Sequence, residues 1–128
     1  MKLEEQVCSL ELAKKLEKLG VRENTLFYWV EDSRDKRKPF KAMSKTRASR
    51  IMSREATITP AFTVAELGEK LPKKTYSQRL KVPSGQHAWG CNNNEYDEYR
   101  TAYTEADARA KMLIYLLENN LLKPNGGN

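Results

Sequence analysis

Residues 25–30 of the chain, Thr-Leu-Phe-Tyr-Trp-Val, decide how the fold is interpreted. Every one of these residues suits a pleated, packed strand. Alternation along a strand places Leu26, Tyr28 and Val30 on one face and Phe27 and Trp29 on the other. A strand with one wet face would alternate with polar residues. The stretch therefore predicts a central strand that is covered on both sides.

Upstream of this strand, residues 9–19 predict an amphipathic helix. Ser9 is a suitable N-cap, because its hydroxyl can accept a hydrogen bond from a free N–H of the first turn. The side chains of Leu12, Leu16 and Leu19 recur on one helical face. Gly20 stands where the end of a helix favours a left-handed residue, so we expect the helix to stop there.

At the other end of the chain, residues 105–119 predict a longer helix. Thr104 to Asp107 resembles a capping box with Asp in place of Glu. The expected buried stripe consists of Ala106, Ala110, Leu113, Ile114 and Leu117. Residues 124–128, rich in Asn and Gly, predict a disordered tail.

Between these helices, short apolar runs alternate with turn signals. Residues 56–62 predict a strand in which Pro60 requires an edge position or a strand end, because proline cannot donate to a ladder. Thr63 and Glu66 form a capping box for a short helix from residue 64 to about 70.

Further along, residues 75–82 predict a half-exposed strand with alternating apolar positions at Tyr76, Leu80 and Val82. Residues 87–91 and 96–103 predict further strands, with Asn92–Asn94 as a loop tip between them.

Residues 31–56 leave two alternatives open. A charged turn runs to Pro39, and the apolar residues after it roughly follow a helical stripe. Residues 40–45 fit one half of a hairpin equally well.

The length of 128 residues corresponds to about one domain. The sequence predicts one α+β domain over residues 1–123, with a basic insertion or loop at about 31–55. We expect a mostly antiparallel sheet on which the N- and C-terminal helices pack. The length and the composition, with six glycines and two cysteines, exclude a collagen, a long coiled coil, a disulfide scaffold and a multidomain enzyme.

The positive charge is concentrated in one segment. The formal net charge is +6, and residues 31–55 alone hold nine basic and four acidic residues. Such a run could neutralise several phosphates without reading base sequence, or it could be a solvated loop. The candidate nucleic-acid-binding residues are Lys36, Arg37, Lys38, Lys41, Lys45, Arg47, Arg50 and Arg54.

Residues that carry chemistry are sparse. Cys8, His87 and Cys91 fall short of the four ligands of a structural zinc site. A helix N-terminus beside Cys8 would lower a thiol pKa, but no base is linked to it in sequence. There is no phosphate-binding glycine loop and no nucleophile elbow. We expect no enzyme, no cofactor, no metal and no small-molecule substrate.

Aromatic residues allow two interpretations. They could build a stacking platform for single-stranded nucleic acid, or they could be core and sheet packing, which we favour for Trp29. The residues concerned are Phe27, Tyr28, Trp29, Trp89, Tyr96, Tyr99 and Tyr103.

Targeting signals are not visible. The N-terminus lacks the apolar region of a secretory signal, and no apolar run approaches the length of about 20 residues that spans a bilayer. Two cysteines are too few for a disulfide framework, so we expect a cytoplasmic protein without membrane contact.

Several blocks of the sequence resemble a group of small proteins carried by prophages and mobile elements of gut-type bacteria. These blocks begin at Val7 (VCSLELAKKL), Thr25 (TLFYWV), Pro60 (PAFTVAELG) and Ala106 (ADARAKMLIYLLEN). The layout is also similar to the phage α-β-α sandwich domain. The resemblance carries over no catalytic residue. It implies the origin and the fold only. From the residues we expect an accessory protein of the bacterial cytoplasm that acts by binding a protein partner or itself, the alternative being non-specific nucleic-acid binding through residues 36–54.

Overall fold

The computed structural model describes residues 2–21, 25–32, 41–52, 56–83 and 88–124. Its elements are, in order, α1 (Leu3–Gln6), α2 (Leu10–Lys18), β1 (Phe27–Asp32), β2 (Lys41–Ser44), α3 (Lys45–Met52), β3 (Ala56–Ala61), α4 (Val64–Lys70), β4 (Thr75–Leu80), β5 (Ala88–Asn93), β6 (Glu98–Ala102) and α5 (Glu105–Glu118). The predicted disordered tail lies outside the described residues, except for Pro124.

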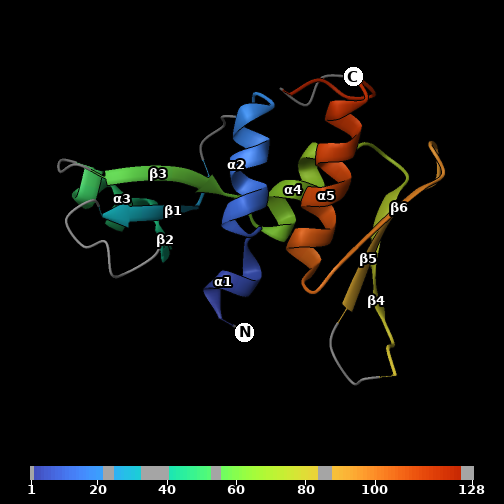
Figure 1. The fold of residues 1–128 in the computed structure, drawn as a ribbon, viewed down its shortest axis with the longest axis horizontal. Coiled ribbons are helices and arrows are strands. Elements are labelled where there is room, and N and C mark those ends of the chain that lie inside the picture. Colours follow the sequence, from blue (N-terminus) through green and yellow to red (C-terminus); the bar gives the residue numbers. More distant parts are fainter. Residues whose placement is uncertain (1, 22–24, 33–40, 53–55, 84–87, 125–128) are drawn as a thin grey trace.

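The strands form two separate antiparallel sheets of three strands each. Their orders are β2-β1-β3 and β4-β5-β6. The two sheets lie at opposite ends of the molecule, with α2, α4 and α5 between them (Figure 1). The α+β class and its antiparallel pairing are confirmed, while the arrangement as two sheets rather than one was not predicted.

The strand over the opening stretch is central, as predicted. β1 pairs with β2 on one side and β3 on the other. Trp29 and the half-buried Phe27 belong to the main core, while Val30 and Tyr28 pack with Met43, Ala48 and Ile58 in a second cluster. Both faces are therefore covered. Only Leu26, which precedes the strand and is 63% exposed, does not follow the prediction.

Both of the alternatives that the sequence left open for residues 31–56 occur, one after the other, within residues 41–52. Residues 41–44 are the hairpin strand β2, and the chain then passes directly into helix α3. Ala48 of α3 is buried against the outward face of β1. Pro60 lies in β3, an edge strand, as its missing N–H requires.

Helix α2 ends as predicted but begins differently. Gly20 has a φ of +96°, and its N–H and that of Val21 bond the carbonyl oxygens of Glu17 and Leu16. Ser9 occupies the N-cap position, yet its side chain makes no cap bond. Its backbone N–H instead donates to Oδ1 of Asp107 at 2.6 Å.

The two other capping predictions have different outcomes. The box of Thr63 and Glu66 is complete, because each side chain accepts from the other residue's backbone N–H. Thr104 accepts from the N–H of Asp107, but the carboxylate of Asp107 does not return the bond, since it accepts from Ser9. The shorter Asp side chain thus joins α5 to α2 rather than closing a local box.

Helix α5 is buried on more than the predicted stripe. All five stripe residues are buried, and so are Ala108, Met112 and Leu116. α5 contacts α2 and α4 on one side and the strands of the second sheet on the other. A helix with apolar residues around its circumference is a core helix, so α5 connects the two halves of the fold.

Candidate functional site

The sheet β4-β5-β6 presents an outer face that no other described element covers (Figure 1). One row runs across all three strands as Tyr76, Asn92 and Tyr99, and the next row as Gln78, Gly90 and Thr101. Tyr76 is 46% exposed and Tyr99 is 44% exposed. We call these six residues the outer face; none of them is charged.

The outer face is shaped by a glycine. A Cβ at Gly90 would lie 2.7 Å from both Cε2 and the hydroxyl oxygen of Tyr99. Because Gly90 has no side chain, the Tyr99 ring can lie over the backbone of β5. Gly90 is buried as a result, and the ring fills the centre of the outer face.

The opposite, inner face of the same sheet holds it to α5 through polar contacts. The hydroxyl of Ser77 donates to Glu105 and accepts from Nε and Nη2 of Arg109 at 3.2 and 3.1 Å. Tyr115 donates to Glu98 at 2.7 Å, and the guanidinium of Arg100 lies 4.3 Å from the Tyr115 ring centre. These contacts hold the sheet against α5, and the side chains of Tyr76 and Tyr99 lie on the opposite face of the sheet.

Charges of both signs lie at one end of the outer face. Lys73 and Lys74 precede β4, while Glu95 and Asp97 lie in the turn between β5 and β6. The N–H of Asn94 donates to the Lys74 carbonyl at 3.1 Å, which holds the two segments side by side. Among the described residues, none of the four charged side chains makes an ion pair within the chain.

The turn that carries these acids is positioned by a buried amide. Asn93 is 1% exposed, donates to Thr75 Oγ1 at 2.8 Å and accepts from the Tyr96 N–H at 2.9 Å. Asn93 is thus part of β5, and its prediction as loop tip was wrong. Only Asn94 of the three belongs to the turn.

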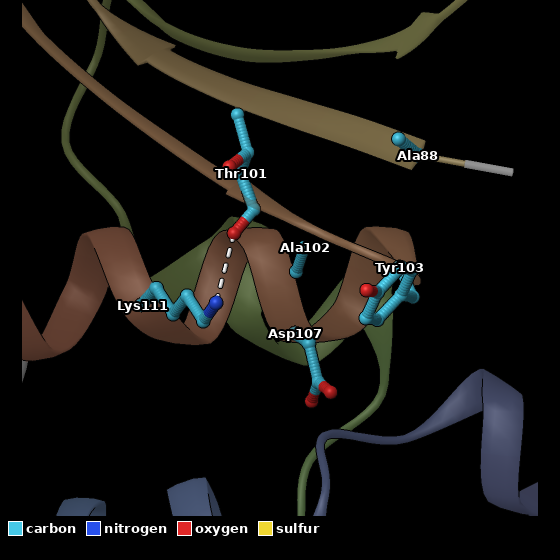
Figure 2. A pocket seen from close by; sticks show the side chains of 6 residues that line it. All are labelled: Ala88, Thr101, Ala102, Tyr103, Asp107 and Lys111. Carbon is cyan, nitrogen blue, oxygen red and sulfur yellow. Dashed lines mark hydrogen bonds between the residues drawn. The ribbon is translucent and has the colours of Figure 1, made fainter. Parts of the chain in front are cut away.

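A pocket of about 340 Å³ lies at the other end of the same sheet, beside the start of α5 (Figure 2). It is lined by Ala88, Thr101, Ala102, Tyr103, Asp107 and Lys111. Burial raises the pKa of Asp107, and its carboxylate is bonded to Ser9. The Lys111 ammonium donates to the Thr101 carbonyl at 2.9 Å. Both charged groups therefore have partners within the fold, and Tyr103, 75% exposed, lies beside the exposed Thr101 and Lys111.

The two cysteines are core residues. Cys8 and Cys91 are free thiols with no exposed surface. Burial raises the pKa of Cys8 to about 12 and that of Cys91 to about 11. The helix N-terminus beside Cys8 does not lower the pKa of its thiol, because desolvation outweighs it. His87 lies outside the described residues, and no cluster that could hold a metal occurs in the described part.

The basic segment is described only in part. Lys36, Arg37, Lys38 and Arg54 lie outside the described residues, and only the backbone is described for Lys41 and Arg50. Lys45 and Arg47 are exposed on α3. Convergence of the eight cations on one face therefore stays a prediction.

The aromatic residues divide between the two interpretations. Trp29 is core, as favoured, and its Nε1 donates to the Cys8 carbonyl at 2.9 Å. Trp89 and Tyr96 are partly buried against the same core. Tyr99 and Tyr103 are exposed. Tyr76 is exposed as well, although we expected it on the apolar side of a half-exposed strand. Only the pairing register across three strands places Tyr76 in one row with Tyr99.

Comparison with known proteins adds no relative. No protein-family model matches the chain, and searches of curated proteins and of solved structures find no match. Within the described residues, no helix is both long and apolar enough to cross a membrane.

Proposed function

We propose that this protein acts by binding another protein through the outer face of β4-β5-β6, without catalysis. The observation that carries the proposal is the uncovered, uncharged row of Tyr76, Asn92 and Tyr99. Tyrosine is enriched in the centres of protein interfaces, where charged residues are depleted. Its ring supplies a large contact area and its hydroxyl keeps a polar partner.

The charges at the rim favour a protein over a nucleic acid as the partner. Single-strand binding combines stacking rings with a groove of continuous positive charge along the phosphates. Glu95 and Asp97 lie beside Lys73 and Lys74 at the same end of the outer face. A phosphate backbone that passed over this end would meet two carboxylates, whereas a protein surface can carry charges that match both signs.

The biological setting is proposed from the sequence resemblance alone. A small binding protein fits an accessory role for a prophage or mobile element in the cytoplasm of a bacterial host. The polar contacts between β4-β5-β6 and α5 support this mode of action, because they keep the outer face rigid before binding, which reduces the entropy that binding costs.

Photo-crosslinking tests the proposal directly. A photoreactive residue replaces Gln78, which lies in the outer face, and in a matched control it replaces Lys15, which is exposed on α2. After nuclease treatment of a host lysate, we expect discrete protein adducts from position 78 only. Adding Tyr76→Ser and Tyr99→Ser should remove these adducts. Equal adducts from both positions, or adducts that nuclease abolishes, would refute the proposal.

A further inference from the structure

The outer face of β4-β5-β6 is complementary to itself. Building on the proposed function, we propose that its occupant is a second copy of this chain, stacked face to face about a two-fold axis parallel to the strands. Two antiparallel sheets pack in this aligned manner about 10 Å apart, with a small angle that arises from their twist. The assembly would be a six-stranded sandwich with an α5 on each outer side.

The row of side chains matches under this rotation. A two-fold axis parallel to the strands sets β4 of one copy over β6 of the other, and β5 over β5. Because Tyr76, Asn92 and Tyr99 form one row, Tyr76 of each copy then lies opposite β6 of the other, and the two Tyr99 rings, which lie over Gly90 of β5, meet near the axis. The two Asn92 amides meet at the centre, where each can donate and accept. The row of each copy therefore faces the same row of the other.

The rim charges match under the same rotation. Lys73 and Lys74 lie on the β4 side of the sheet end, and Glu95 and Asp97 lie in the β5–β6 turn at that same end. Exchanging β4 with β6 brings the lysines of each copy towards the acids of the other. Two-fold symmetry repeats this contact, so that all four charged side chains of each copy acquire an opposite charge.

The other face-to-face arrangement is unfavourable. An axis perpendicular to the strands would set β4 over β4 with its ends exchanged. The two lysines before β4 would then approach Lys81 of the other copy, which follows β4 and is exposed. Like charges set against each other suppress wrong arrangements of an interface. The charge pattern therefore selects the parallel axis.

The size of the outer face sets the strength of the pair. Three strands about 4.8 Å apart and six residues at about 3.3 Å each give a footprint of roughly 15 by 20 Å per copy. Such an area lies below that of standard specific interfaces and suits only a weak, transient one. We therefore expect a weak, reversible dimer with a dissociation constant in the micromolar range or above.

The test exchanges one charge in each of two variants. Lys73→Glu and Glu95→Lys are both exposed positions without a positive φ, so neither substitution strains the backbone. In a dimer of either variant with itself, positions 73 and 95 carry like charges at both symmetric contacts. In a mixture of the two variants, both contacts again join opposite charges. Sedimentation velocity over rising protein concentration measures each association.

The expected results are specific. The parent chain dimerises, each variant alone dimerises about tenfold more weakly at low salt, and the equimolar mixture recovers the parental association. Lys15→Glu, on the exposed side of α2, is the matched control and leaves dimerisation unchanged. Tyr99→Ser abolishes it.

Three results would overturn the self-pairing. They are a parent chain that stays monomeric to about millimolar concentration, a mixture that associates no better than its components, and a single-stranded oligonucleotide that binds the outer face in place of a protein. The first two leave protein binding by the outer face intact when the crosslinks from Gln78 reach a different protein. The failure of the dimer is therefore distinguishable from the failure of the proposed function.

Discussion

Replacing Gly68 by alanine should destabilise the protein, although the residue lies inside helix α4. Alanine in a helix interior usually stabilises by about 0.5–1 kcal/mol relative to glycine. At this position a Cβ would overlap Nη1 of Arg109, and no atom outside that side chain is among its near neighbours. The Arg109 guanidinium must therefore move away.

The loss can be estimated from the contacts of Arg109. Nη1 donates to the Val64 carbonyl at 3.3 Å, and Nη2 lies 3.2 Å from a Glu105 carboxylate oxygen. A hydrogen bond to a charged group contributes about 1.5–3 kcal/mol when buried. Because the side chain is 23% exposed, solvent reduces this value. We take a loss of about 2 kcal/mol, which exceeds the helix gain and leaves a net destabilisation of about 1 kcal/mol.

A double-mutant cycle isolates the reason. In an Arg109→Met background the steric conflict is gone, so that Gly68→Ala should stabilise by about 0.5–1 kcal/mol. The sign of the substitution therefore reverses between the two backgrounds. Urea unfolding followed by far-ultraviolet circular dichroism measures all four free energies. If Gly68→Ala changes stability by the same amount and sign in both backgrounds, the role assigned to Gly68 is wrong.

Three other predictions concern the core, the acid at the start of α5 and the basic segment. Trp29→Phe leaves the buried Cys8 carbonyl without its donor and should lower the free energy of urea unfolding by about 1–3 kcal/mol; a change near zero would contradict the hydrogen bond. The pKa of Asp107 in the folded state is raised above its ordinary value of 3.8, chiefly by burial. The contribution of this carboxyl group to the free energy of unfolding is therefore complete below pH 3.8 and is lost as the pH rises through the folded pKa. The stability advantage of the parent over Asp107→Asn should therefore shrink as the pH rises from below 3.8, and an advantage that grows would have the wrong sign. For the nucleic-acid alternative, replacing Arg37, Lys38 and Lys41 together by Glu should abolish any gel shift on DNA or RNA. An unchanged gel shift would show that this segment does not bind the nucleic acid.

Local signals in the sequence were reliable where one residue decides the backbone. Gly20 ends α2, Thr63 and Glu66 close a capping box, and Pro60 lies in an edge strand. The two-sided apolar pattern of β1 also predicted its central position. Each of these features depends on the conformation or hydrogen bonding of neighbouring residues, which the sequence shows directly.

Features that depend on distant partners were missed. The periodicity of α5 predicted one buried stripe, since alanine fits either side of a helix, but two layers bury it from opposite directions. Asp107 looked like half of a local capping box, yet its carboxylate bonds a backbone N–H 98 residues away in sequence. The candidate site shows the same limit, because Tyr76 and Tyr99 come together only through the register with β5.

The sequence by itself determined the α+β class, the central strand over residues 27–30 and the ends of most helices, because backbone preference and hydrophobic periodicity act over a few residues. Only the tertiary structure decided that the strands divide into two sheets around α5 and that one sheet face stays uncovered. The exposure of a face depends on which elements pack against it, and that packing joins residues far apart along the chain.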